Sequence, residues 1–137
     1  MKYFMCMPLA IAILTTSAYA FQPSANVEIF EQFDDIRVVA FISENEINNS
    51  PLWDPDMGTP PLNVKEAIQA LREFNNNSKK DEAIKEIEIK IVPRHLNHWH
   101  YLIKTVNNVS KNNKFNVYVV LMNGKVIPAT IEPEAYK

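Results

Sequence analysis

The chain has 137 residues, a formal net charge of −2 at pH 7 and one cysteine. Both signs of charge are mixed along it, which excludes the strongly basic footprint of proteins that bind nucleic acid or an anionic membrane. Glycine occurs only at Gly58 and Gly124. A glycine-rich phosphate loop and a Gly-X-Ser-X-Gly nucleophile elbow are therefore excluded as well.

The first twenty residues predict a cleavable secretory signal peptide. Lys2 supplies positive charge, Phe4 to Leu14 form an apolar stretch, and Ala18-Tyr19-Ala20 places small residues where signal peptidase reads them. The apolar stretch is shorter than the roughly 20 residues that cross a bilayer. We therefore expect a periplasmic or secreted protein with no stable membrane anchor after cleavage. Its single mature domain, residues 21–137, would lack cysteine because Cys6 leaves with the signal.

Residues 21–61 predict an N-terminal strand followed by a proline-rich loop. Ile36–Ser43 is expected to be a strand with its even-numbered apolar residues on one face, whereas Val27–Phe33 fits either a strand or a short helix. Glu44 to Pro61 is expected to be a loop, because its prolines remove backbone donors. We expect Trp53 in this loop to fold back over one end of the core.

Residues 62–128 predict one helix and an antiparallel β-meander. Asn63 and Glu66 form a capping-box pattern at the start of an amphipathic helix over Leu62–Phe74. Its apolar stripe comprises Val64, Ala67, Ile68, Leu71 and Phe74.

Three strands are expected after this helix. Isoleucines alternate with charged residues over Glu86–Ile91, and Trp99, Tyr101 and Ile103 alternate with His100, Leu102 and Lys104 in a second strand. The third strand, Phe115–Met122, is apolar on both faces. Asn123-Gly124 predicts a hairpin turn into a short strand that Pro128 ends. The predicted fold is α+β, with one helix packed on a four- to five-stranded antiparallel sheet.

Three segments of this region resemble PepSY-like domains, which are small extracytoplasmic modules with a cystatin-like helix on an antiparallel sheet. The segments are Pro61–Ala67, Trp99–Ile103 and Val117–Ile127, and the similarity covers Leu62 to Pro128. The chain departs from the pattern at Met122-Asn123, where the family usually carries an acidic residue. The resemblance implies a non-catalytic module, which in some relatives inhibits a peptidase or serves as a pro-region. It carries over no site residue.

The doubly apolar strand also suggests an interaction surface. A single helix covers one sheet face, so we expect Leu102, Tyr118, Val120 and Met122 to lie on the other. Two explanations remain open: cover from within the chain, by the Ile36–Ser43 strand, the Trp53 loop or Phe30 and Phe33, or cover by a partner. The leading functional hypothesis is a non-catalytic binding module. It would use these residues and Trp53 to engage a protein or peptide of the cell envelope, a protease being one candidate.

The alternative hypothesis concerns His95, His98 and His100. Three neutral imidazoles would suit Zn²⁺ or Cu²⁺, whereas the simpler interpretation is a polar turn followed by a strand that carries histidines on its outer face. The pair Asp54 and Asp56 lacks the remaining ligands of a calcium loop and is interpreted as a surface turn. A small hydrolase ranks third. We predict no catalytic residue and no required cofactor.

Overall fold

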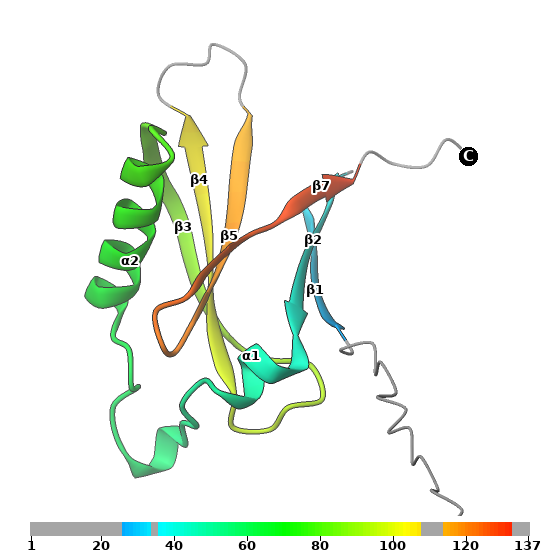
Figure 1. Ribbon diagram of the computed structural model, residues 1–137, viewed down its shortest axis with the longest axis vertical. Coiled ribbons are helices and arrows are strands. Elements are labelled where there is room, and N and C mark those ends of the chain that lie inside the picture. The colour runs from blue at the N-terminus through cyan, green and yellow to red at the C-terminus, as the bar shows by residue number, and fades with distance from the viewer. Residues whose placement is uncertain (1–25, 34–35, 108–113, 133–137) are drawn as a thin grey trace, which may run out of the picture.

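The computed structural model describes residues 26–33, 36–107 and 114–132, so the predicted signal peptide lies outside the described residues. Its strands are β1 (Asn26–Phe33), β2 (Ile36–Ser43), β3 (Glu82–Ile91), β4 (Trp99–Asn107), β5 (Phe115–Leu121), β6 (Val126–Pro128) and β7 (Thr130–Glu132). Its helices are α1 (Glu44–Asn48), the 3₁₀ turn η1 (Pro55–Met57) and α2 (Val64–Asn77) (Figure 1). None of these helices is long and apolar enough to cross a membrane.

The strands form two antiparallel sheets, one of three strands in the order β1-β2-β7 and one of four in the order β3-β4-β5-β6. The α+β class with one main helix is confirmed. The ambiguous segment Val27–Phe33 is a strand that pairs along its whole length with β2. The structure has one more sheet than the sequence predicted.

A single short segment joins the two sheets. Strand β6 pairs with β5 as far as Pro128, and two residues later, at Thr130, the chain begins β7 and pairs with β2 (Figure 1). Pro128 has no N–H to continue the first ladder, and Ala129 donates its N–H to the carbonyl of Val117 at the crossing. The two sheets therefore behave as one bent surface with β3 and β1 at its outer edges.

The bend encloses the first half of the core. Val38, Ala40 and Ile42 of β2 pack against Leu102, Val117, Val119 and Leu121 of the larger sheet. Ile47 of α1 closes one end of this layer and is fully buried. Helix α1 was predicted as loop. It forms because Ser43 accepts a hydrogen bond from the N–H of Glu46 and Glu46 reaches back to Ser43, which is a capping box.

Helix α2 covers the opposite face of the four-stranded sheet. Its cap is the predicted one: the Asn63 side chain accepts from the Glu66 N–H at 2.9 Å, and Glu66 accepts from the Asn63 N–H at 2.8 Å. Ala67 and Leu71 are buried against Tyr101, Ile103, Tyr118, Val120 and Met122. Val64, predicted to pack on the sheet, is instead 48% exposed.

Candidate functional site

The residues predicted to form an exposed binding face are buried, so that prediction is wrong. Tyr118, Val120 and Met122 lie beneath α2, and Leu102 lies on the other face against the three-stranded sheet. Leu102 pairs with Val119, which places it opposite to Tyr118 in the pleat. All four are core residues, and the interpretation that the chain covers its own sheet is the correct one.

Trp53 has a structural role that the sequence only hinted at. Its ring packs edge-on against Trp99, with ring centroids 5.0 Å apart. Trp53 Nε1 donates to the Gly58 carbonyl, and Trp99 Nε1 donates to the Trp53 carbonyl, both at 2.9 Å. Trp53 N–H donates to the carbonyl of Asn97. The two tryptophans thus fix the proline-rich loop to the turn between β3 and β4.

These two fixed segments carry the most exposed large apolar side chains in the described part of the chain. Met57 is 84% exposed, Leu96 81% and Leu52 62%. Leu52 forms an isolated antiparallel bridge with His98, so the segments that carry Leu52 and Leu96 run side by side. We call these three residues the apolar tip. The sequence signal was present, since each is a large apolar residue inside a polar or proline-rich segment.

Two aspartates and one arginine lie close in sequence to the tip residues. Asp54 caps η1 by accepting the Asp56 N–H at 3.0 Å, and both aspartates are exposed. Arg94, in the turn before Leu96, is also exposed and has a left-handed backbone with φ of 64°. This combination of apolar side chains and a few charges on a fixed backbone is typical of an interaction surface.

The three histidines do not assemble into a metal site. His100 is almost fully buried and points between the sheets, while the rings of His95 and His98 have centroids 6.1 Å apart. His95 Nδ1 lies 3.0 Å from the Pro93 carbonyl. Among the described residues, no three histidine, cysteine, aspartate or glutamate side chains are grouped as metal ligands. The predicted set of three ligands is therefore wrong: His100 is buried within β4, whereas His95 and His98 lie part-exposed in the turn before that strand.

One histidine lies near a carboxylate, at a pocket of about 410 Å³ lined by Asn26, Val27, Glu44, Arg94 and His95. His95 Nε2 lies 3.8 Å from Glu44 Oε1, an ion-pair distance that is too long for a hydrogen bond. The pocket lining contains no serine, threonine or cysteine. A nucleophile activated by a base, which a hydrolase of the serine or cysteine type requires, is not brought together here.

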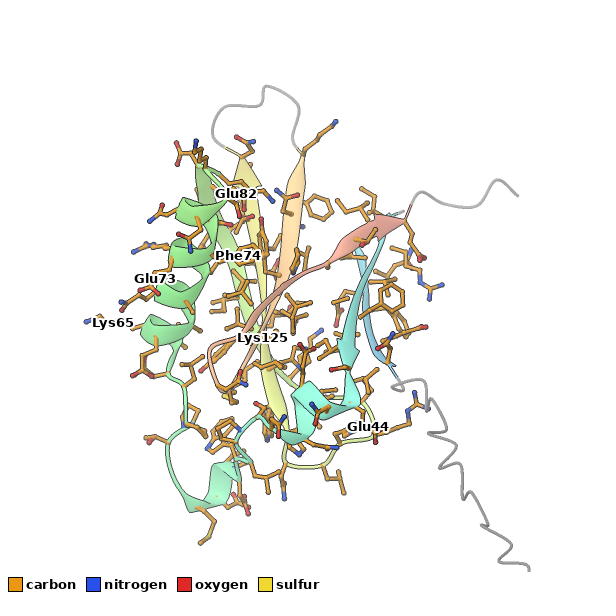
Figure 2. All side chains as sticks on the ribbon, viewed as in Figure 1. Glu44, Lys65, Glu73, Phe74, Glu82 and Lys125 are labelled. Atoms are coloured by element: carbon orange, nitrogen blue, oxygen red, sulfur yellow. The ribbon has the colours of Figure 1, made fainter. Side chains whose placement is uncertain are left out.

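Among the described residues, the Glu82 carboxylate accepts four side-chain hydrogen bonds. Its Oε2 accepts from Thr105 Oγ1 at 2.6 Å and Asn75 Nδ2 at 3.2 Å, and its Oε1 accepts from Asn116 Nδ2 at 2.6 Å and the Tyr118 hydroxyl at 3.0 Å (Figure 2). Burial, together with the hydrogen bond to Glu82, raises the pKa of Tyr118. Three of these bonds join β3 to β4 and β5 within the sheet, and the bond from Asn75 joins α2 to it, so this is a structural carboxylate.

A second surface feature is a groove of about 570 Å³ on α2. Its lining consists of Val64, Lys65, Ile68, Gln69 and Arg72. Lys65 extends away from the sheet in Figure 2. The groove is open and follows one helix surface, and it lacks the convergent polar groups that orient a small ligand.

Comparisons with protein-family models, curated proteins and solved structures each find no match.

Proposed function

We propose that this chain is an extracytoplasmic, non-catalytic module that binds a folded protein through its apolar tip, Leu52, Met57 and Leu96. The exposure of these three side chains on a backbone fixed by Trp53 and Trp99 carries the proposal. Large apolar side chains gain the most from leaving water, and a rigid backbone loses little conformational entropy when it binds. A protease of the same compartment is one candidate partner.

A protein is a better partner for the tip than a membrane. Asp54 and Asp56 stand next to Met57, and their charge would be repelled by anionic lipid headgroups. The three tip residues lie on loops and a short 3₁₀ turn, whereas interfacial membrane binding uses a long amphipathic helix with a basic face. An apolar pocket with a polar rim on a partner protein matches this surface.

The PepSY-like resemblance belongs to the same proposal. Its support is the arrangement of residues 62–128, in which α2 lies on one face of the β3-β4-β5-β6 meander. The predicted helix cap and the predicted hairpin, whose turn places Gly124 at φ of 86°, both lie within this unit. Peptidase inhibition in some PepSY-like relatives motivates testing proteases first.

The test compares protein expressed from the full-length coding sequence with the triple variant Leu52→Asn, Met57→Asn, Leu96→Asn. A photo-crosslinking residue at position 57 identifies contacting proteins in the native cell envelope, and each candidate is then purified and titrated directly. We expect saturable one-to-one binding that the triple variant weakens at least about tenfold, because tip anchors dominate such interfaces. Candidate proteases are also assayed for inhibition.

The matched control carries three polar changes away from the tip, Lys65→Gln, Gln69→Ser and Arg72→Gln, on the exposed surface of α2. It should bind as tightly as the original chain. Equal binding by the tip variant, or loss of binding in both variants, would contradict the proposal. Sedimentation of the original chain with phosphatidylglycerol vesicles, abolished in the tip variant, would also contradict it by assigning the tip to lipid.

A further inference from the structure

Strand β3 is an unusual edge. It runs ten residues, Glu82–Ile91, and among the described residues it pairs only with β4. A register shift between Ile84 and Glu86 interrupts its N-terminal part, but from Glu86 to Ile91 the pairing with β4 is regular. Long regular edges present unpaired backbone groups to other chains, and natural proteins normally blunt or cover them.

The direction of the free backbone groups follows from the hydrogen bond at the base of the hairpin. Val92 donates its N–H to the carbonyl of His98 at 2.8 Å, so the backbone N–H of Val92 is directed toward the β4 side of the strand. Antiparallel ladders alternate, which turns the N–H and C=O groups of Ile87, Ile89 and Ile91 outward. The outer edge of β3 therefore presents the backbone N–H and C=O groups of three alternate residues, with Ile89 in the middle.

The side chains around Ile89 are self-complementary. Glu88 and Lys90 lie on one face of the strand, and Ile87, Ile89 and Ile91 on the other. If a second β3 pairs antiparallel with a two-fold axis at Ile89, Glu88 stands opposite Lys90 of the second copy, twice. On the other face Ile89 meets Ile89, and Ile87 meets Ile91, again twice. Opposite charges and apolar pairs at directly opposed positions stabilise such ladders.

Neighbouring registers are disfavoured by charge. Moving the second strand by two residues places either Glu88 opposite Glu88 or Lys90 opposite Lys90 on the axis, and like charges directly opposed destabilise a strand pair. Lys90 already contacts Glu31 and Glu88 within its own chain. An ammonium group has three donors, which leaves one for Glu88 of the second copy.

The apolar side chains beside this edge are incompletely covered by the chain itself. Ile89 is 38% exposed and Ile91 45%, although both lie on the face that α2 covers elsewhere. A paired strand would place isoleucines of the second copy directly against them. We propose that the chain forms a two-fold homodimer by antiparallel pairing of β3 with β3, centred on Ile89. The dimer uses Glu88, Ile89 and Lys90 and the proposed binding function uses Leu52, Met57 and Leu96, so separate variants test the two proposals independently.

The test uses sedimentation velocity on protein expressed from the full-length coding sequence. The original chain should show a concentration-dependent dimer, and Glu88→Lys should weaken it at least about tenfold by placing lysine opposite Lys90. A second variant, Glu31→Lys with Lys90→Glu, reverses the intramolecular pair and places a glutamate opposite Glu88 of the second copy. Each variant alone should be monomeric, and an equimolar mixture should form a heterodimer because both contacts are then between opposite charges.

A cysteine variant tests the register. In a Cys6→Ser background, Ile89→Cys should form an intermolecular disulfide under mild oxidation, because paired residues on the axis bring Cα atoms within disulfide range. Gln69→Cys, exposed on α2, is the control and should not crosslink efficiently. Circular dichroism and thermal unfolding establish that each variant is folded.

Three results would overturn the dimer. The first is a chain that stays monomeric at about 1 mM, a concentration at which even a weak specific dimer is populated. The second is a dimer that Glu88→Lys does not weaken. The third is an equimolar mixture of the two charge variants that stays monomeric.

Discussion

His100 is a polar side chain buried in the core. It lies on β4 between Lys90 and Leu121, it is 1% exposed, and neither ring nitrogen has a hydrogen-bond partner among the described residues. Burial, and to a smaller extent the charge of Lys90, lowers the pKa of His100 to about 4. The imidazole is therefore neutral in the folded protein at neutral pH.

This burial makes stability depend on pH. The unfolded chain takes up a proton at His100 near its ordinary value of 6.5, whereas the folded chain does so only near 4. The stabilisation is complete above pH 6.5 and is lost as the pH falls toward 4, at up to about 1.4 kcal/mol per pH unit. Urea unfolding at a series of pH values should show this loss in the original chain.

The variant His100→Leu should flatten this slope and should be at least as stable at pH 7, because it removes a buried polar group without a partner. Carboxylates also titrate in this range, so the informative quantity is the difference between the two slopes. Equal slopes for the two proteins would show that His100 does not control the acid sensitivity.

Helix α2 is the element in which local signals are strongest. Asn63, Glu66 and the buried Ala67 and Leu71 lie close together in the sequence, and the structure confirms both the cap and the central packing. A helix start depends on groups three residues apart, so the sequence is sufficient to locate it. Helix α1 had the same signal, Ser43 with Glu46, inside a segment whose prolines favoured a loop.

The cap of α2 should contribute measurably to stability. Asn63→Ala removes the acceptor for the Glu66 N–H, and we expect the free energy of unfolding to fall by about 1 kcal/mol. Asn77→Ala, at the exposed last position of the helix, is the matched control and should change stability by less than about 0.5 kcal/mol. Denaturant unfolding of both variants distinguishes capping from a general effect of replacing asparagine.

At the scale of the whole molecule, an ion pair joins β1 and β3, the outer strands of the two sheets. Glu31 of β1 and Lys90 of β3 form a partly buried ion pair, and Lys90 also lies 3.0 Å from Glu88. Burial opposes the charge of Lys90, but hydrogen bonds to Glu31 and Glu88 outweigh it and raise the pKa of Lys90. The pair links residues 59 positions apart in the chain, across the opening between the edges.

A double-mutant cycle measures this link. Glu31→Gln and Lys90→Met, singly and together, should give a coupling free energy of about 0.5 to 1 kcal/mol, because both side chains remain partly in water. The coupling should shrink in about 1 M salt, which screens partly exposed charges. A coupling of zero at low salt would mean that apolar packing alone holds the two edges together.

The sequence by itself determined the α+β class, the helix with its cap, and the two faces of Phe115–Leu121, which the structure assigns to two separate core layers. Each of these depends on a periodicity or a contact within a few residues. The sequence also marked Trp53 as important, but it could not say that Trp99 would hold it.

Only the tertiary structure decided what lies on the second face of the larger sheet. The crossing at Ala129 carries the chain from one sheet to the other and places β2 over Leu102, so a face that the sequence left open became core. The same packing buried His100 and left Leu52, Met57 and Leu96 outside. These outcomes depend on pairings between residues far apart in the chain, which no local pattern encodes.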